Sequence, residues 1–272
     1  QLLRISQKSN IQIVKLINTG TTKNNLILNI IDYLLINIFN IDKLSPFFNN
    51  KGIFIKLFSK LDIKYIKNIN EKNFIINLRK NNYDYAFSFC CNQIFKNELI
   101  SSFRKIINYH SSILPKYKGL NSTLWSIFCK EKYTGFSYHY INNKIDNGNI
   151  IYQEKFKINY NYSYKKIEIF KTLLAKKSLQ KVISLVSKNF SGIKQKKKGS
   201  YFGNNEIKKL ITFRKIKNID KIKKIIDIWG GIILIKNNKK YYITKISHKG
   251  KILRISNYPV LIFKFIKLFK RN

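Results

Sequence analysis

The sequence predicts an α/β protein with a parallel sheet, and two patterns in the first 110 residues support this prediction. Short apolar runs of strand length alternate with segments of helical spacing, between breaks of Asn, Lys and Gly. One run, residues 85–90, is apolar throughout most of its length, which is typical of a strand buried on both faces. Strands that alternate with helices at this spacing are usually joined by crossovers into a parallel sheet.

The elements of the first half follow from length and apolar spacing. Within 71–81, for example, Phe74, Ile75 and Leu78 recur at helical spacing. The predicted strands are 11–17, 63–69, 85–90 and 105–109, and the predicted helical segments are 25–39, 53–58, 71–81 and 95–103.

After residue 110 the pattern changes to longer, irregular connections. Pro115 and Gly119 indicate a loop over 112–119, and 164–190 is the best helix because it is long, periodic and free of Gly and Pro. The other predictions here are a helix over 121–130 capped by Asn121 or Ser122, strands at 136–141 and 150–158 around a polar turn, a helix over 217–228, and a hairpin of 232–236 and 241–246.

The domain organisation follows from a Lys-rich break after the long helix. We expect a first domain over 1–193, a basic linker over 194–200 and a small C-terminal module over 201–272. The chain starts at Gln1 rather than Met, which predicts that the N-terminus of the first domain is incomplete.

The composition limits the class of protein. Apolar residues make up 44% of the chain, enough for a core, and its most apolar stretches are interrupted by polar residues. No basic and apolar signal peptide opens the chain, so we expect a cytoplasmic protein without membrane insertion. The oligomeric state stays open.

The charge has two interpretations. The chain carries 53 Lys and Arg against 13 Asp and Glu, a formal charge of +40, which favours an anionic partner such as nucleic acid. Lys, Asn, Ile, Phe and Tyr are all abundant, however, which is the profile of AT-rich codons. Mutational bias alone could therefore have raised the Lys content.

The cysteines predict neither a disulfide framework nor a metal site. Cys90 and Cys91 are adjacent and Cys129 stands alone, so the count is odd and no CxxC spacing exists. A zinc site needs more ligands than these supply. We expect reduced thiols and no bound metal.

One window of the sequence concentrates residues that can do chemistry. Asn108 and His110 lie two apart at the end of a predicted strand, so their side chains share one face. Ligands of open α/β sheets bind outside the carboxyl ends of strands. Asp146 follows within the same window, in the stretch Ile145-Asp146-Asn147-Gly148. His139, on a predicted strand between them, is interpreted as structural.

Residues 108–153 resemble the signature of the 10-formyltetrahydrofolate-dependent formyltransferases. The shared elements are Asn-x-His at 108–110, LPKYKG at 114–119 and IDNG at 145–148. The resemblance is strong from 83 to 153, weak up to 202, and poor elsewhere. Tyr109 and Ser111 stand where members commonly carry Ile and Pro. The resemblance implies a Rossmann-like formyltransferase fold with a mostly parallel twisted sheet and a small C-terminal α/β extension.

The resemblance also implies roles for the candidate residues. His110 and Asn108 are expected to donate to the oxyanion that forms when an amine attacks a formyl group. Asp146 is expected to hold His110 charged, or to accept the amine proton through water. The implied co-substrate is 10-formyltetrahydrofolate. Its expected contacts lie in two loops, with the residues Cys91, Gln93, Ile94, Phe95, Asn142 and Ile145.

The acceptor amine is not settled by the resemblance. The charge and the C-terminal residues favour the methionyl-tRNA type, with initiator tRNA as partner, and an amino sugar on a nucleotide comes second. The glycinamide ribonucleotide type ranks third, because its glycine-rich phosphate loop is not evident. A non-catalytic relative that binds RNA or a membrane surface is a further alternative, which the intact Asn108, His110 and Asp146 oppose.

Overall fold

A computed structural model of the chain describes residues 15–18, 62–89, 91, 93–247, 249 and 252–256. The predicted helical segments 25–39 and 53–58 lie outside these residues. The described residues divide into two compact units. The first unit contains those up to Ala86 and those from 91 to Arg104. The second unit contains Phe87–Phe89 and those from Lys105 onward.

The first unit pairs two strands in parallel and packs two helices around a small apolar cluster. Its elements are β1 (Lys15–Asn18), β2 (Asp62–Tyr65), α4 (Lys72–Asn81) and α5 (Asn97–Ile100). The cluster joins Ile75 and Leu78 of α4 to Ile69 and Leu99. The predicted helix over 71–81 is confirmed, whereas the one over 95–103 shortens to the single turn of α5.

The main sheet of the second unit has the strand order β3-β4-β6-β7. These strands are β3 (Tyr85–Phe89), β4 (Lys105–His110), β6 (Tyr133–Tyr140) and β7 (Ile150–Lys157). All four were predicted within a few residues, and the α/β fold class is confirmed. β6 pairs antiparallel with both β4 and β7. The connection between β6 and β7 is a short turn, which joins neighbouring strands only in the antiparallel sense.

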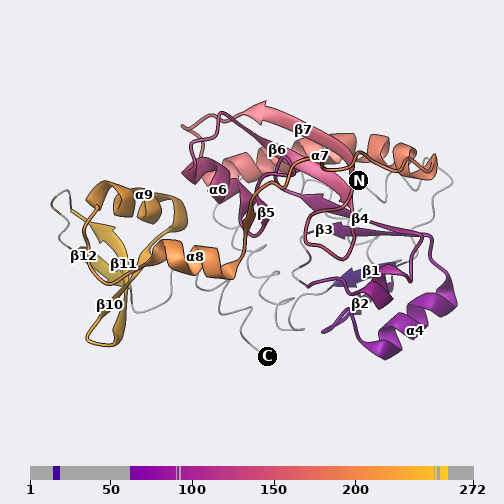
Figure 1. Ribbon diagram of the computed structural model, residues 1–272, viewed down its shortest axis with the longest axis horizontal. Helices are drawn as coiled ribbons and strands as arrows, with labels where there is room; N and C mark the ends of the chain where they lie inside the picture. Colours follow the sequence, from indigo (N-terminus) through magenta and orange to yellow (C-terminus); the bar gives the residue numbers. More distant parts are fainter. Residues whose placement is uncertain are drawn as a thin grey trace, which may run out of the picture. The chain divides into compact units, whose positions relative to one another are not determined.

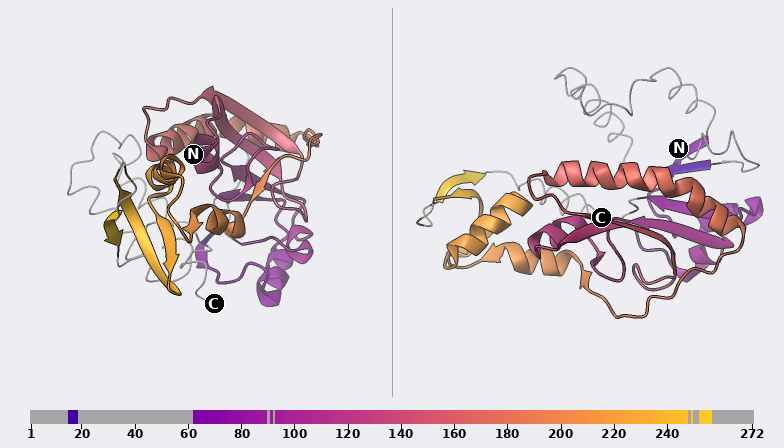
Figure 2. Two further views of the ribbon diagram at one scale, coloured as in Figure 1. Left: turned by 60° about the vertical axis from the view of Figure 1, so that its left-hand side comes forward. Right: turned by 90° about the horizontal axis from the view of Figure 1, so that it is seen from above.

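Two helices cover this sheet. The short α6 (Ser122–Phe128) follows Asn121, and the long α7 (Tyr164–Ser187) runs along β6 and β7 (Figure 2). The hydroxyl of Ser163 caps α7 by accepting from the backbone N–H of Lys166. The buried face of α7 repeats at helical spacing: Ile167, Lys171, Ala175, Ser178, Leu179, Val182 and Val186.

The residues after α7 run back across the loops of the main sheet. The backbone groups of Ile193 and Ile150 bond to each other in both directions. Farther on, β8 (Tyr201–Phe202) pairs in parallel with β5 (Lys118–Gly119). We call residues 193–203 the strap. It contains the predicted linker 194–200 and lies within the second unit; the division into separate domains at this point stays a prediction.

The C-terminal part is a second four-stranded sheet with the order β12-β11-β10-β9 (Figure 1). The turn of its hairpin, Asn237-Asn238, has both residues in the left-handed region, at φ 49° and 56°, as a tight type I′ turn requires. The hairpin and the helix after residue 217 are confirmed. The elements are α8 (Asn204–Ile211), β9 (Thr212–Phe213), α9 (Ile219–Trp229), β10 (Ile232–Lys236), β11 (Lys239–Ile246) and β12 (Ile252–Ser256).

The apolar core of this part is continuous with α6. The ring of Trp125 on α6 stacks on Phe202 with 4.0 Å between centroids, and it meets Trp229 of α9 edge-on at 5.1 Å. Ile211, Ile225 and the other buried residues of α8, α9 and the sheet belong to the same cluster. Aromatic pairs of this geometry add to the free energy of burial. Within the described part of the chain, no helix has the length and apolar character to cross a membrane.

Replacing Trp229 with Ala tests this shared core. The side chain is 1% exposed, so its loss leaves a cavity, and we expect the free energy of unfolding to fall by about 3–5 kcal/mol. Urea denaturation followed by far-UV circular dichroism measures the change. The control, Lys221→Ala, removes an exposed side chain of the same helix and should stay within about 0.5 kcal/mol of the parent. Equal stability of the two variants would contradict the packing.

Candidate active site

The three predicted residues come together in the second unit. Asn108 and His110 lie on β4, and Asp146 lies in the turn between β6 and β7. His110 Nδ1 is 3.4 Å from Asp146 Oδ2, and Asp146 Oδ1 is 3.4 Å from His139 Nε2. Asn108 Nδ2 donates to His139 Nε2 at 3.1 Å. The carboxylate therefore lies between two imidazoles, and the amide contacts one of them.

His139 belongs to this cluster, although its place on an alternating strand predicts a structural role. The antiparallel register pairs Asn108 of β4 directly with His139 of β6. Directly opposed residues project from the same face of a sheet, so the pairing brings the two side chains together. Nδ1 of His139 donates to the carbonyl of Tyr140 at 2.8 Å, which leaves Nε2 to accept from Asn108. The sequence could have shown this only if the strand pairing had been known.

The turn that carries Asp146 is fixed at several points. Asp146 itself adopts the left-handed region at φ 46°, and the backbone N–H of Gly119 donates to its Oδ2 at 2.8 Å. From the strap, Gln195 Nε2 donates to the carbonyls of Asp146 and Gly148 at 3.0 and 2.9 Å. A Cβ at Gly148 would lie 1.8 Å from the carbonyl oxygen of Tyr140, so the turn closes only over glycine.

Burial and neighbouring charge act in opposite directions on Asp146. Burial raises the pKa of its carboxyl group, because an ion loses its hydration. The attraction of His110 and His139, which acts when the nitrogen that faces Asp146 carries a proton, and the hydrogen bond from the Gly119 N–H outweigh that effect and lower the pKa to about 2. Asp146 is therefore ionised at neutral pH.

For His110, the effect of burial on the pKa outweighs that of the neighbouring groups. Burial lowers the pKa of the imidazole below its usual 6.5, although Asp146 and the carbonyl of Tyr117 both act to raise it. Nε2 donates to that carbonyl at 2.8 Å, and Nδ1 faces Asp146. The expectation that Asp146 holds His110 charged is therefore wrong at neutral pH: the ring is mainly neutral, because desolvation outweighs the attraction. A second proton would enter at the nitrogen that faces the carboxylate.

The predicted folate contacts divide between the two units. In the first unit, Gln93 is engaged with the backbone of Ile69 and Lys67, Phe95 packs on the apolar cluster, and Ile94 is 66% exposed. There, Cys91 Sγ donates to the Gln93 carbonyl at 3.8 Å.

In the second unit, the remaining two predicted contacts lie on the same turn as Asp146. Asn142 accepts from the Lys144 N–H, and Ile145 is 43% exposed. Over the residues that the structure describes, no three His, Cys, Asp or Glu side chains gather in a way that could hold a metal ion.

Titration of His110 checks the electrostatics of the site. We expect its pKa below 6.5, and lower still in Asp146→Asn, because the substitution removes the carboxylate that raises it. Proton NMR of the imidazole resonances, assigned with His→Gln variants, measures both values. Asp227→Asn removes an exposed carboxylate and should leave the titration unchanged. A His110 pKa above 6.5 would contradict the dominance of burial.

Substitution of Gly148 by Ala tests the closure of the turn. The added methyl group overlaps the Tyr140 carbonyl, so the turn must shift, and we expect the free energy of unfolding to fall by about 1–3 kcal/mol. Thermal and urea unfolding measure the change. Asn143→Ala, an exposed position in the same turn, is the matched control. If the two variants unfold alike, Gly148 is not needed for its small size.

Comparison with known proteins places these residues in a family. A family model described as formyl transferase matches residues 48–183, which is half of the chain and includes the whole cluster. A methionyl-tRNA formyltransferase of Borrelia garinii subsp. bavariensis is 33% identical over 134 residues, 48% of this chain and 42% of the relative. A GDP-perosamine N-formyltransferase of Brucella melitensis is 44% identical over 52 residues, 19% of this chain and 20% of that protein.

Among solved structures, a sugar N-formyltransferase of a Shewanella species has the same fold. Its TM-score is 0.58 at 21% identity, and the match covers 86% of this chain and 98% of that one. Against the methionyl-tRNA formyltransferases of Borrelia garinii and Finegoldia magna, the chain spans less than half of their length. Since the family model covers half of the sequence and the structure has the fold of a formyltransferase, the chain belongs to the formyl transferase family.

Proposed function

We propose that the protein transfers a formyl group from 10-formyltetrahydrofolate to an acceptor amine. The observation that carries this proposal is the convergence of Asn108, His110 and Asp146 in one largely buried cluster. All three lie in the part of the chain that the family model matches.

The cluster suits the chemistry of this transfer. Attack of an amine on a formyl carbon forms a C–N bond and places negative charge on the formyl oxygen, which hydrogen-bond donors stabilise. We assign that role to the side-chain amide of Asn108, and to His110 once its Nδ1 has taken up a proton. As the bond from the formyl carbon to the donor nitrogen breaks, the acceptor nitrogen loses one proton and the donor nitrogen gains one. The ionised Asp146 and the neutral His110 are the groups that can accept the first proton.

The folate contacts are proposed at the two loops named from the resemblance. In the second unit, Ile145 supports this assignment, because it lies on the turn of Asp146 and exposes an apolar side chain that a flat ring system can cover. Ile94 belongs to the set by the resemblance alone. Cys91, Gln93, Phe95 and Asn142 complete the proposed set.

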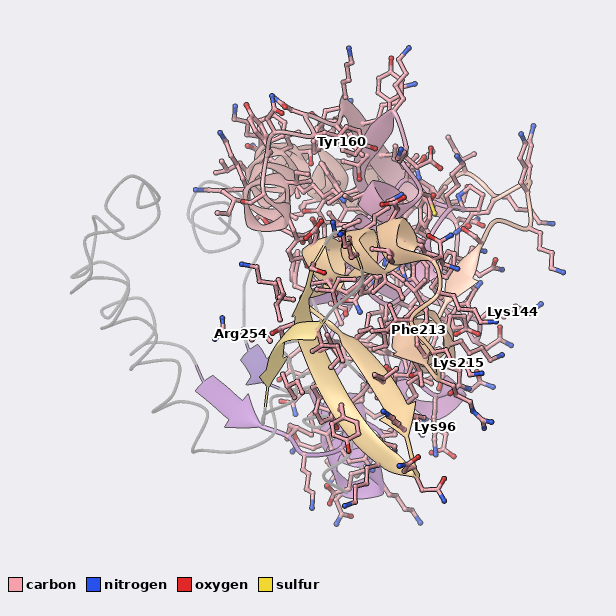
Figure 3. The ribbon with its side chains drawn as sticks, turned by 90° about the vertical axis from the view of Figure 1, so that its left-hand side faces the viewer. Lys96, Lys144, Tyr160, Phe213, Lys215 and Arg254 are labelled. Carbon is pink, nitrogen blue, oxygen red and sulfur yellow. The ribbon has the colours of Figure 1, made fainter. Side chains whose placement is uncertain are left out.

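Methionyl-tRNA is the acceptor that we place first. It is supported by the methionyl-tRNA formyltransferases at 33% and 27% identity and by the exposed basic side chains of the C-terminal part. Lys215 and Arg254 are labelled in Figure 3, which views the molecule from that side. The exposed set is Lys208, Lys209, Arg214, Lys215, Lys217, Lys221, Lys236, Lys239, Lys240, Lys245, Lys249 and Arg254. Such a surface binds phosphates without reading sequence.

An amino sugar on a nucleotide is the second candidate. The Brucella relative is 44% identical over its 52 matched residues, and the Shewanella structure matches along nearly its whole length. Either acceptor would present a primary amine to the same cluster.

A transfer assay tests the proposal. Wild-type protein is given 10-formyltetrahydrofolate with initiator methionyl-tRNA or with a panel of nucleotide-linked amino sugars, at about 150–200 mM salt to suppress non-specific binding. Substitution of Asn108 by Ala, His110 by Ala or Asp146 by Asn should lower kcat/KM by about 10²-fold or more. Asp227→Asn is the control for the loss of one carboxylate.

The outcomes separate the acceptors. Formylation of tRNA alone would support a role in translation initiation, and formylation of a sugar would make the second candidate correct. Variants that keep the turnover of the wild-type protein would overturn the assignment of the cluster.

A further inference from the structure

Lys171 is a fully buried lysine for which the proposed chemistry has no use. It lies on the inner face of α7, and its side chain is 0% exposed. Charged side chains are rarely buried completely, because the ion loses its hydration. A buried ammonium group therefore needs hydrogen-bond acceptors or a counter-charge inside the protein.

The ammonium group of Lys171 holds the chain directly after His110. Its Nζ donates to the carbonyl oxygen of Ser111 at 2.7 Å. The hydroxyl of Ser122 donates to the same oxygen at 3.0 Å, while it also bonds to the Ser111 hydroxyl at 2.8 Å. The Thr123 hydroxyl also lies 3.4 Å from this oxygen, so the carbonyl of the residue after His110 is held by one charged donor with neutral hydroxyl groups beside it.

The charge of Lys171 is balanced through a hydroxyl group rather than by direct contact. Nζ also donates to Thr123 Oγ1 at 2.5 Å, and that hydroxyl in turn donates to the carboxylate of Glu168. The carboxylate oxygen lies 4.0 Å from Nζ and is itself partly exposed. The counter-charge of Lys171 therefore lies at the limit of ion-pair distance, and the Thr123 hydroxyl connects the two groups.

The electrostatics agree with this geometry. Burial lowers the pKa of Lys171 to about 8, although Glu168 acts to raise it, so the side chain is mainly protonated at neutral pH. Four groups act on the charge state of His110 besides its burial. Asp146 and the Tyr117 carbonyl raise its pKa, and His139 and Lys171 lower it.

We propose that Lys171 is a positioning residue for His110: its ammonium group holds the carbonyl of Ser111, the residue directly after His110, and its charge adds to burial in opposing a second proton on the imidazole. The inference rests on the proposed function in one respect, namely that a neutral His110 is the form that takes up a proton during formyl transfer. In that case Lys171 acts on the reaction only through His110 and contacts no substrate.

Lys171→Met removes the charge and keeps the length of the side chain. We expect the pKa of His110, measured by NMR in the absence of any substrate, to rise. We also expect kcat to fall about tenfold or more with little change in KM, since the displaced group acts in the chemical step. The acid limb of the kcat profile should move to higher pH together with the NMR value. Lys177→Met, which removes an exposed lysine of the same helix, should change none of these.

Two further variants separate charge from packing, and they serve if Lys171→Met does not fold. Lys171→Arg keeps the charge and should leave the titration of His110 near that of the wild-type protein. Lys171→Gln keeps one donor for the Ser111 carbonyl without the charge, and it should raise the pKa of His110 as Met does. A His110 that titrates alike in all variants would overturn the inference.

Failure of the proposed function can be distinguished from failure of the inference about Lys171. A wild-type protein that formylates none of the acceptors would overturn formyl transfer, but the substrate-free titration of His110 would still decide the role of Lys171.

Discussion

The arrangement of the second unit depends on the contacts of one buried carboxylate, that of Asp146. Separate segments of the chain reach it: His110 at the end of β4, Gly119 before α6, and His139 on β6. Its backbone carbonyl is held by Gln195 of the strap. An ionised carboxylate that lost any of these partners would remain buried without compensation, which is costly. Each segment is therefore held in place partly by what the others supply to one charged group.

Opposing effects of burial give the two central groups different charge states at neutral pH. Asp146 accepts three favourable interactions and stays ionised, whereas His110 loses more from desolvation than it gains from its neighbours. Because Asp146 is ionised and His110 is neutral, the pair can accept a proton during the reaction. A fully formed ion pair would already hold it. The charge of Lys171 acts on the same balance by lowering the pKa of His110.

The sequence alone was sufficient for the main sheet, the long helix and the three motif residues, because these have strong local signals. Asn108, His110 and Asp146 stand in a motif with fixed spacing, and 164–190 has clear helical periodicity. His139 was missed because its partner is set by strand register. Lys171 and Gln195 were missed because, in a Lys-rich segment, the sequence does not distinguish a lysine or glutamine that points inward from one that is exposed. The two-residue strands β5 and β8 are too short for periodicity to indicate them.

The aromatic contact between α6 and the C-terminal part bears on how such proteins can be recombined. Trp125 is covered by Phe202 and Trp229, and the strap that leads there also supports the turn of Asp146. Exchange of the C-terminal part for that of another family member would therefore not be a neutral swap of modules. A functional chimera must supply aromatic side chains that cover Trp125. It must also keep the strap of the protein that receives the new C-terminal part. A substitution in the strap would therefore be felt both at the aromatic cover of α6 and at the turn that holds the carboxylate.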